Sequence, residues 1–270
     1  MLSYESLQIF RDIPKGTSAP TPEQLALVRH HMVGCLDLDT AYSAARFEAD
    51  VMRLLPQLWQ RSRYAVMCGG SMMYVDAVLN GIDELPEVSA GVRSHVLRMW
   101  ESGGIELLRQ TLQELDPAYL ATADVNNHRR LIHAIEVSLE SGVPYSSLCT
   151  GRKAVRPWHT LKIAIDRPRD VLFDRINSRV DAMIDAGLES EARSVYHMRC
   201  LNSLNTVGYK EMFAWFDGVM DRETAIARMK KNTRVYAKKQ LTWLKRDESV
   251  IWLSDEGDAK GMAEEVLKLL

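Results

Sequence analysis

Apolar residues recur along most of this chain with the period of an α-helix, and short apolar runs interrupt that pattern. Residues 42–61 carry apolar side chains at helical spacing, and residues 63–70 then form a short apolar run that ends in two glycines. Such a run predicts a strand that meets a tight turn. Residues 71–81 return to helical spacing and end at a glycine, so this stretch predicts a parallel sheet covered by helices.

A block of helices follows. Three segments between about residues 86 and 142 have apolar residues at helical spacing, with Gly or Pro at their ends. Strand-like segments return at residues 160–168 and 249–254, and helices are predicted at residues 169–188 and 259–270. We therefore predict an α/β fold with an inserted all-helical subdomain. The core is assigned to residues 1–82 and 158–270, and the subdomain to residues 83–157.

Basic residues are concentrated near the C-terminus, although the chain as a whole is slightly acidic. Its 270 residues carry a formal net charge of -2, so a polyanion must be bound by a local patch. On a helix that begins at about Asp221, four basic residues recur at three, four and seven positions and form one stripe: Lys231, Arg234, Lys238 and Lys245. The stripe is either a solvated helix face or a surface that follows nucleic-acid phosphates.

The composition is that of an ordinary globular protein, with 46% hydrophobic residues and four widely spaced cysteines. The cysteines show no metal-ligand or disulfide spacing, which favours a reducing cytoplasm. The N-terminal residues lack the features of a signal peptide, and no apolar stretch approaches the ~20 residues that cross a bilayer. We therefore expect a cytoplasmic protein that has no membrane partner.

Two short stretches offer binding chemistry, and each also has a plainer explanation. His128, Arg129 and Arg130 begin a predicted helix, where cations and unpaired backbone N–H groups can face phosphate or where asparagines simply cap the helix. Gly208 and Tyr209 offer a flexible point and a ring that can stack on an unpaired base. The plainer explanation there is a loop with a half-buried tyrosine.

A third stretch, CGGSMMY, follows the predicted strand at residues 63–70. Gly69 and Gly70 allow the backbone to come close to whatever lies beyond the strand end, where open α/β sheets bind ligands, and Ser71 adds a hydroxyl. The alternative is a tight turn capped by serine.

Taken in order, these stretches resemble the tRNA dimethylallyltransferases, also called tRNA isopentenyltransferases. ESLQIFRDIPKGTSAP is similar to the family's D-S-x-x-x-Y-x-x-x-x-x-G-T-A-K-P segment, YSAARF to Y-S-A-A-D-F, and GGSMMY to G-G-T-x-x-Y. NNHRRLIHAIEV resembles N-x-x-R-x-x-R-A-L-E-V, NTVGYKEM resembles x-x-x-G-Y-K/R-E/Q-M, and TRVYAKKQLTWLKR resembles T-R-R-Y-A-K-R-Q-L-T-W-F-R. The resemblance extends from about residue 2 to residue 253.

The resemblance implies a P-loop-NTPase-like parallel sheet flanked by helices, and a prenyl-transfer reaction. The dimethylallyl group of dimethylallyl pyrophosphate would move to N6 of the adenosine on the 3′ side of the tRNA anticodon, with release of pyrophosphate. It also implies Mg2+ beside the pyrophosphate, a nucleotide-binding (ATP-binding) scaffold, and the tRNA anticodon stem-loop as partner. The basic stripe would then meet the phosphates of that stem, and we expect the protein to act as a monomer.

The resemblance also assigns roles to residues. Glu5 stands where the family has its Asp general base, Ser71 replaces a threonine that faces the target base, and Arg179 matches an arginine on the substrate pyrophosphate. As plain sequence, Arg179 could equally be a solvated helix residue. The predicted tRNA contacts are Glu5, Ser6, Leu7, Gln8, Ser71, Arg93, His128, Arg129, Arg130, Leu131, Ile132, Asn205, Thr206, Val207, Gly208, Tyr209, Lys210, Arg234 and Lys238.

Two departures from the family pattern leave alternatives open. Family members begin with an apolar strand and a G-P-T-x-x-G-K-[ST] phosphate loop; this chain has neither, so we expect its sheet to lack a central strand. Glu5 replaces the Asp, and a carboxylate moved by roughly an ångström can cost on the order of a hundredfold in rate. One alternative is a catalytically impaired tRNA-binding paralogue, and another is a truncated enzyme. A third is a nucleoside-phosphate kinase, but a kinase would require the phosphate loop.

Overall fold

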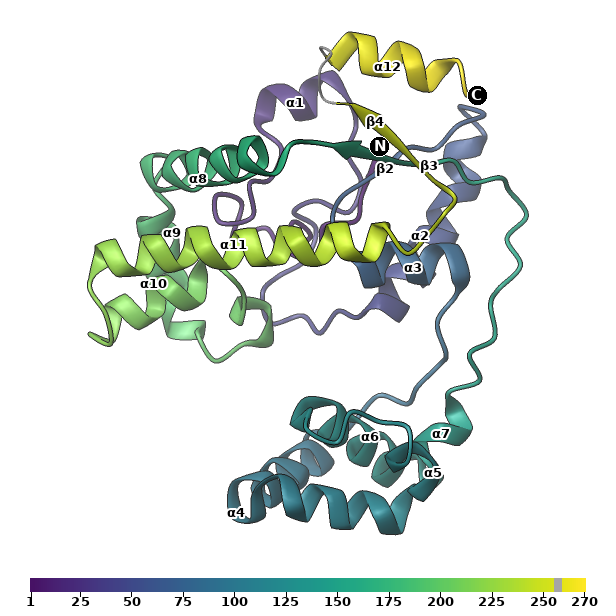
Figure 1. Ribbon diagram of the computed structural model, residues 1–270, viewed down its shortest axis with the longest axis vertical. Coiled ribbons are helices and arrows are strands. Elements are labelled where there is room, and N and C mark those ends of the chain that lie inside the picture. The colour runs from purple at the N-terminus through teal and green to yellow at the C-terminus, as the bar shows by residue number, and fades with distance from the viewer. Residues whose placement is uncertain (255–258) are drawn as a thin grey trace. The chain divides into compact units, whose positions relative to one another are not determined.

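The computed structural model describes residues 1–254 and 259–270 and divides the chain into two compact units (Figure 1). Unit 1 comprises Met1–Ser43, Asp50–Val75 and Arg156–Leu270, and unit 2 comprises Ala44–Ala49 and Asp76–Val155. Each unit is described by itself below. Among the described residues, no helix is both long enough and apolar enough to cross a membrane.

The strands of unit 1 form two small parallel sheets. β1 (Leu2–Ser3) pairs with β2 (Met67–Cys68), and β3 (Lys162–Asp166) pairs with β4 (Val250–Ser254). The predicted strands correspond to β2, β3 and β4, whereas β1 was missed because two residues carry no readable alternation.

The pairing differs from the single sheet that the pattern predicts. In the described part of the chain, the two strand pairs share no hydrogen-bonded neighbour, and β1 has only an isolated bridge to His31 on its other side. Apolar side chains near the strands are left exposed, with Val66 61% and Ile165 46% accessible. The fold class is therefore α/β with small parallel sheets.

Helices are the main regular structure of unit 1, and side chains cap the start of two of them. The side chain of Thr21 caps α1 (Pro22–Leu27) in a capping box with proline at the first turn, and Asp221 caps α11 (Arg222–Leu244). The other helices in or bordering this unit are α2 (Ala44–Trp59), α3 (Met72–Asn80), α8 (Arg169–Asp185), α9 (Leu188–Val195), α10 (Tyr209–Phe216) and α12 (Ala259–Leu267), with short 3-10 turns at Tyr196–Met198 and Asn202–Leu204.

The main core of unit 1 lies among α8 to α11 and the segment that follows β1. Ile9 and Ile13 from that segment pack with Val180 of α8, Met212 of α10 and Met229 of α11. α8 and α11 lie side by side (Figure 1). The core thus holds the segment that follows β1 against α11, the helix that carries the basic stripe.

Unit 2 is helical. It contains α4 (Ala90–Leu115), α5 (Pro117–Leu120), α6 (His128–Ser141) and α7 (Tyr145–Leu148), with α4 packed on α6. The pattern predicted two helices where α4 stands; the structure joins them across a kink at Gly104, whose φ of 59° and ψ of -153° are not helical. The helical block that was predicted from about residue 86 begins at Ala90, because Ser89 caps its first helix. The division into a core at residues 1–82 and 158–270 and a subdomain at residues 83–157, with their separate functions, remains a prediction.

Candidate active site and nucleic-acid interface

The chain turns directly after β1, and hydrogen bonds hold that turn. The hydroxyl of Ser3 accepts the Glu5 N–H (3.3 Å) and donates to the Gln8 side-chain oxygen (2.9 Å). Gln8 in turn donates to the carbonyl oxygens of Thr17 (3.3 Å) and Ser18 (3.1 Å). The predicted segment from Glu5 to Gln8 is therefore a fixed turn at the carboxyl end of a strand, where ligands of parallel sheets bind.

The glycine turn after β2 meets this segment from the neighbouring strand. Ser71, which is 7% exposed, accepts the Ser6 N–H through its hydroxyl at 2.8 Å. The backbone N–H of Gly70 donates to the Glu5 carboxylate. In this structure Ser71 positions the turn, and its contact with a target base remains a prediction.

Arg179 completes this group from α8. Burial raises the pKa of the Glu5 carboxyl, whereas the positive charge of Arg179 and the Gly70 N–H both lower it. Arg179 Nε also donates to the Ser18 hydroxyl at 2.9 Å, next to the carbonyl that Gln8 holds. The three predicted catalytic residues, Glu5, Ser71 and Arg179, are thus gathered around one turn.

Two further residues reach the same turn, and the sequence did not single them out as functional. From α11, Tyr236 Oη donates to the carbonyl oxygen of Gly70 at 3.2 Å, and Gln240 Nε2 donates to it at 2.9 Å. Burial raises the pKa of Tyr236, and the nearby charge of Glu5 raises it further. Their polar side-chain ends were the only signal in the sequence that could have found them.

Arg234 and Lys238 of the basic stripe lie against α8. Arg234 donates to the side chain of Asn177, and its guanidinium carbon lies 5.8 Å from the centre of the Phe173 ring. Lys238 Nζ lies 5.5 Å and Arg169 Cζ 5.1 Å from the same ring. Cations from two helices therefore converge over one aromatic side chain, which places local positive charge beyond what a solvated stripe provides.

Tyr209 is fully buried (0% exposed). Its hydroxyl donates to Glu191 at 2.5 Å, and the same carboxylate accepts the backbone N–H groups of Lys15 (2.9 Å) and Gly16 (2.8 Å). The expectation that this ring stacks on an unpaired base is therefore corrected, because the ring is packed in the core and offers no face. The sequence did not single out Glu191. Its carboxylate connects α9 by hydrogen bonds to α10 and to the loop at Lys15 and Gly16.

The rest of the stretch around Tyr209 is mixed in exposure. Gly208 has a φ of 100°, which favours glycine, and its N–H donates to Glu211 at 2.7 Å. The exposed positions are Asn205 and Lys210, and the half-buried ones are Thr206 and Val207. Asn205 and Lys210 are thus the side chains of this stretch most open to RNA.

In unit 2 the predicted tRNA-contacting run lies at the start of α6, where Asn127 caps the helix. The His128 ring stacks on Trp100, with ring centres 4.7 Å apart and planes 9° from parallel. Leu131 is 0% exposed and Ile132 packs against the same core. Leu131 therefore belongs to the core of this unit, and its assignment as a tRNA contact remains a prediction.

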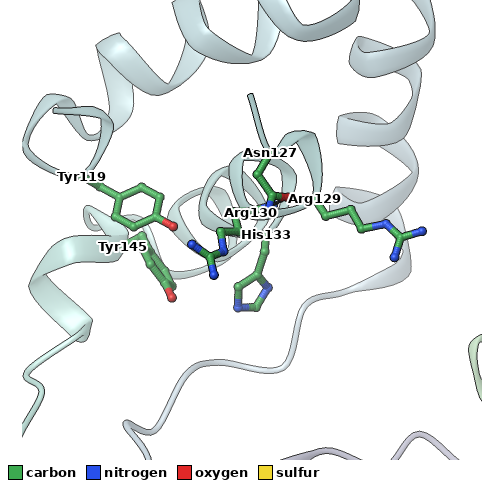
Figure 2. Close-up of a pocket in the computed structure, with 6 residues that line it drawn as sticks. All are labelled: Tyr119, Asn127, Arg129, Arg130, His133 and Tyr145. Carbon is green, nitrogen blue, oxygen red and sulfur yellow. Dashed lines mark hydrogen bonds between the residues drawn. The ribbon is translucent and has the colours of Figure 1, made fainter. Parts of the chain in front are cut away.

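Arg129 and Arg130 are exposed and border a pocket of about 450 Å³ in unit 2 (Figure 2). Arg93 Nε lies 3.9 Å from the carboxylate of Glu136, so its charge is partly paired. The residues that line the pocket are Tyr119, Asn127, Arg129, Arg130, His133 and Tyr145.

Sequence comparisons match this chain to known proteins over most of its length. A family model described as IPP transferase matches residues 8–247. The tRNA dimethylallyltransferase 2 of Parabacteroides distasonis is 47% identical over 260 residues, which are 96% of this chain and 87% of that protein. The tRNA dimethylallyltransferase 1 of Bacteroides fragilis is 48% identical over 256 residues, 95% of this chain and 85% of that protein.

Solved structures give the same result for the fold. The full-length tRNA isopentenylpyrophosphate transferase of Bacillus halodurans superposes with a TM-score of 0.71 at 32% identity, covering 99% of this chain and 86% of that one. A eukaryotic dimethylallyltransferase acting on tRNA superposes with a TM-score of 0.81, covering 99% of this chain and 71% of that one. Because the sequences are only 22% identical, this second similarity supports the fold alone.

Proposed function

The chain belongs to the IPP transferase family, and from this premise we propose that Glu5, Arg179 and the turns around them carry out prenyl transfer to tRNA. The enzyme transfers a dimethylallyl group from dimethylallyl pyrophosphate to an adenosine of tRNA. The acceptor that we propose is N6 of the adenosine on the 3′ side of the anticodon. Pyrophosphate is the second product.

The chemistry requires a base and a cationic group close together. As the bond between N6 and the allylic carbon forms, the bond from that carbon to the pyrophosphate oxygen breaks, and the amine must lose a proton. In our proposal Glu5 accepts that proton, and Arg179 stabilises the negative charge of the departing pyrophosphate. Because burial raises the pKa of Glu5, its carboxylate is a stronger base than an exposed one, while Arg179 favours its ionised form.

The observation that carries this proposal is the environment of Glu5. A half-buried carboxylate lies at the carboxyl end of β1, accepts the Gly70 N–H, and feels the charge of Arg179. Carboxylates with such specific partners in a ligand-binding position are candidates for acid–base catalysis. Ser71, Tyr236 and Gln240 support the same turn by hydrogen bonds.

The tRNA partner is proposed to be the anticodon stem-loop. Arg234 and Lys238 supply positive charge in unit 1, and Arg129 and Arg130 supply it in unit 2. The target base must leave its stack to reach Glu5, as in other enzymes that modify bases.

Mg2+ is proposed to arrive with the pyrophosphate. Among the described residues, no three His, Cys, Asp or Glu side chains gather as a metal site. Mg2+ commonly keeps several waters and binds through substrate phosphates with one or two carboxylates, so a protein cage is not required. No step above depends on the ion. We also propose a cytoplasmic monomer, a setting in which the four cysteines, all free thiols here, stay reduced.

The test is the variant Glu5→Gln, which keeps the shape of the side chain but cannot accept the proton. We expect transfer to fall about 10²- to 10⁴-fold, the usual contribution of a general base, while the affinity for tRNA stays within about twofold. Glu87→Gln, at an exposed position of unit 2, is the matched control and should keep full activity. A Glu5→Gln enzyme with undiminished transfer would rule Glu5 out as the base.

A further inference from the structure

A tight turn at residues 14–19 supplies a hydrogen-bond partner of Arg179. Within the turn, the N–H of Ser18 donates to the carbonyl oxygen of Lys15 at 3.1 Å, and the N–H of Ala19 donates to that of Pro14 at 2.8 Å. Ser18 has a φ of 46°, in the left-handed region that favours glycine. Its hydroxyl accepts Arg179 Nε at 2.9 Å. The position of this hydroxyl therefore depends on whatever holds the turn in place.

A buried carboxylate from a distant part of the chain holds this turn. Glu191 of α9 is 8% exposed and accepts two successive backbone N–H groups of the turn, those of Lys15 at 2.9 Å and Gly16 at 2.8 Å. The fully buried Tyr209 donates its hydroxyl to the same carboxylate at 2.5 Å. Burial raises the pKa of Tyr209, and the bond to Glu191 raises it further, so the hydroxyl keeps its proton and remains a donor. Three charge-assisted hydrogen bonds thus meet at one carboxylate.

Close packing fixes the turn further. A β-carbon at Gly16 would lie 2.2 Å from Tyr209 Oη, so glycine allows the tyrosine to lie directly against the backbone of the turn. From the segment that follows β1, the Gln8 side chain donates to the carbonyl oxygens of Thr17 and Ser18 at 3.3 and 3.1 Å. The turn is therefore connected both to the core and to the segment that carries Glu5.

The hydrogen bond from Nε leaves the other donors of Arg179 for a ligand. A guanidinium has five N–H groups in a rigid fork, and four of them are on its two terminal nitrogens. These four are the groups that meet phosphate oxygens two at a time. Arg179 is an exposed side chain, and its bond to Ser18 restricts the directions in which the terminal nitrogens point. Such restriction lowers the entropic cost of binding and favours a productive geometry.

We propose that Glu191 and Tyr209 are positioning residues for prenyl transfer, because they fix the turn that orients Arg179 toward the pyrophosphate. The Ser18 hydroxyl is the link between that turn and the arginine. The inference rests on the proposed function, which assigns Arg179 to the leaving group. It gives a role in turnover to two side chains that are buried in the core. The family segment G-T-A-K-P has alanine at the position of Ser18, so this link is a feature of this chain.

The first experiment removes the Ser18 hydroxyl in two ways. Ser18→Gly relieves the unfavourable backbone conformation and Ser18→Ala keeps it, so the two variants differ in stability although both lack the hydroxyl. We expect both to lower transfer about tenfold, the usual effect of losing a hydrogen bond to a charged group, with the affinity for tRNA unchanged. Ser178→Ala, at the exposed position of α8 next to Arg179, is the matched control and should keep full transfer.

The second experiment removes the hydroxyl that donates to Glu191. Tyr209→Phe should lower transfer about tenfold, again with the affinity for tRNA unchanged. Tyr196→Phe is the matched control, because that hydroxyl donates to the carboxylate of Asp217, outside the turn, and its loss should leave transfer unchanged. Glu191→Gln should lower transfer further than Tyr209→Phe. Tyr209→Phe and Ser18→Ala still test the proposal if Glu191→Gln fails to fold.

Double variants separate positioning from a general loss of structure. In the Arg179→Ala background, Ser18→Ala and Tyr209→Phe should cause no further loss of transfer, because the group that they orient is absent. A merely structural defect would multiply with the loss caused by Arg179→Ala. Inorganic pyrophosphate, titrated against the full chain, is a second probe. Ser18→Ala and Tyr209→Phe should weaken its binding about tenfold, and Arg179→Ala should weaken it at least as much.

The proposal is overturned if both Ser18 variants keep full transfer, or if Tyr209→Phe loses no more than Tyr196→Phe. Losses that multiply with that of Arg179→Ala would also overturn it. Failure of the proposed function alone gives a different result: the unaltered protein would show no transfer, although its binding of pyrophosphate still depended on Ser18, Tyr209 and Arg179. A protein that neither transfers the prenyl group nor binds pyrophosphate would overturn both.

Discussion

At the scale of single residues, our proposal depends on the electrostatic balance around the Glu5 carboxyl. Burial raises the pKa of this carboxyl, and Arg179 opposes the rise. Because Glu5 must be ionised to accept a proton, turnover should fall as the pH drops through its pKa. That acid limb should lie above the ordinary glutamate value.

Arg179→Ala tests both parts of this balance. Loss of the cation should lower turnover by about 10²- to 10³-fold, as for other groups that stabilise developing charge, with the affinity for tRNA nearly intact. Without the cation the pKa of Glu5 rises, so the acid limb of the residual activity should move to higher pH. Turnover against pH and a tRNA binding curve provide the measurement. Equal loss of turnover and tRNA affinity would remove the pyrophosphate assignment, and Arg228→Ala, an exposed arginine of α11, is the control.

Residue roles were only partly readable from the sequence. The resemblance named Glu5 and Arg179, and in the structure the charge of Arg179 lies close enough to lower the pKa of the Glu5 carboxyl. Tyr209 illustrates the limit, because exposure of a ring depends on packing between segments far apart in the chain, here with Glu191 and Gly16. No local pattern reports such a contact.

At the scale of elements, the close approach of β1 and β2 depends on glycine. A β-carbon at Gly69 would lie 2.7 Å from the carbonyl carbon of Tyr4 and 2.9 Å from the amide nitrogen of Glu5. Backbone cannot yield as a flexible side chain can, so the turn that carries Glu5 would have to move.

Gly69→Ala should therefore destabilise the protein by about 1–3 kcal/mol and reduce transfer about a hundredfold, because a displacement of about 1 Å suffices for such a loss. Thermal unfolding and single-turnover transfer are the measurements. Gly91→Ala, at a helical position of α4 where the added methyl group would meet nothing within 4 Å, should be neutral or slightly stabilising. Full activity of Gly69→Ala would contradict the described geometry of the turn.

The basic stripe of α11 makes a second prediction at this scale. Replacing Arg234 and Lys238 together by alanine should weaken tRNA binding and lower the slope of log affinity against log salt by about one for each lost phosphate contact. The matched control, Arg228→Ala with Lys239→Ala, removes one arginine and one lysine from a different face of the same helix. A salt slope that is unchanged in the first pair, or equally lowered in the control, would mean that the stripe is merely solvated.

Helices with capping residues or long periodic patterns could be predicted from the sequence, whereas the pairing of strands could not. Asp221 marked a helix start within one residue, and the helical block of unit 2 followed its periodicity. The arrangement of strands into two small sheets depends on hydrogen bonds between distant segments. A two-residue strand such as β1 leaves no trace in the sequence.

At the scale of the whole molecule, each unit has its own hydrophobic core and its own candidate contact with tRNA. Unit 1 holds Glu5, Arg179 and the basic helix, and unit 2 holds the aromatic pocket. In our account the chemistry takes place in the first unit, and the arginines of the second unit contribute contacts with tRNA.

The most direct test of the central claim is a transfer assay on this chain. The protein is incubated with unmodified tRNA, dimethylallyl pyrophosphate and Mg2+, and the tRNA is then digested and its nucleosides are weighed. Our account predicts an adenosine heavier by one dimethylallyl group. Unchanged nucleosides from a protein that still binds the stem-loop would contradict it and identify a tRNA-binding relative without the activity.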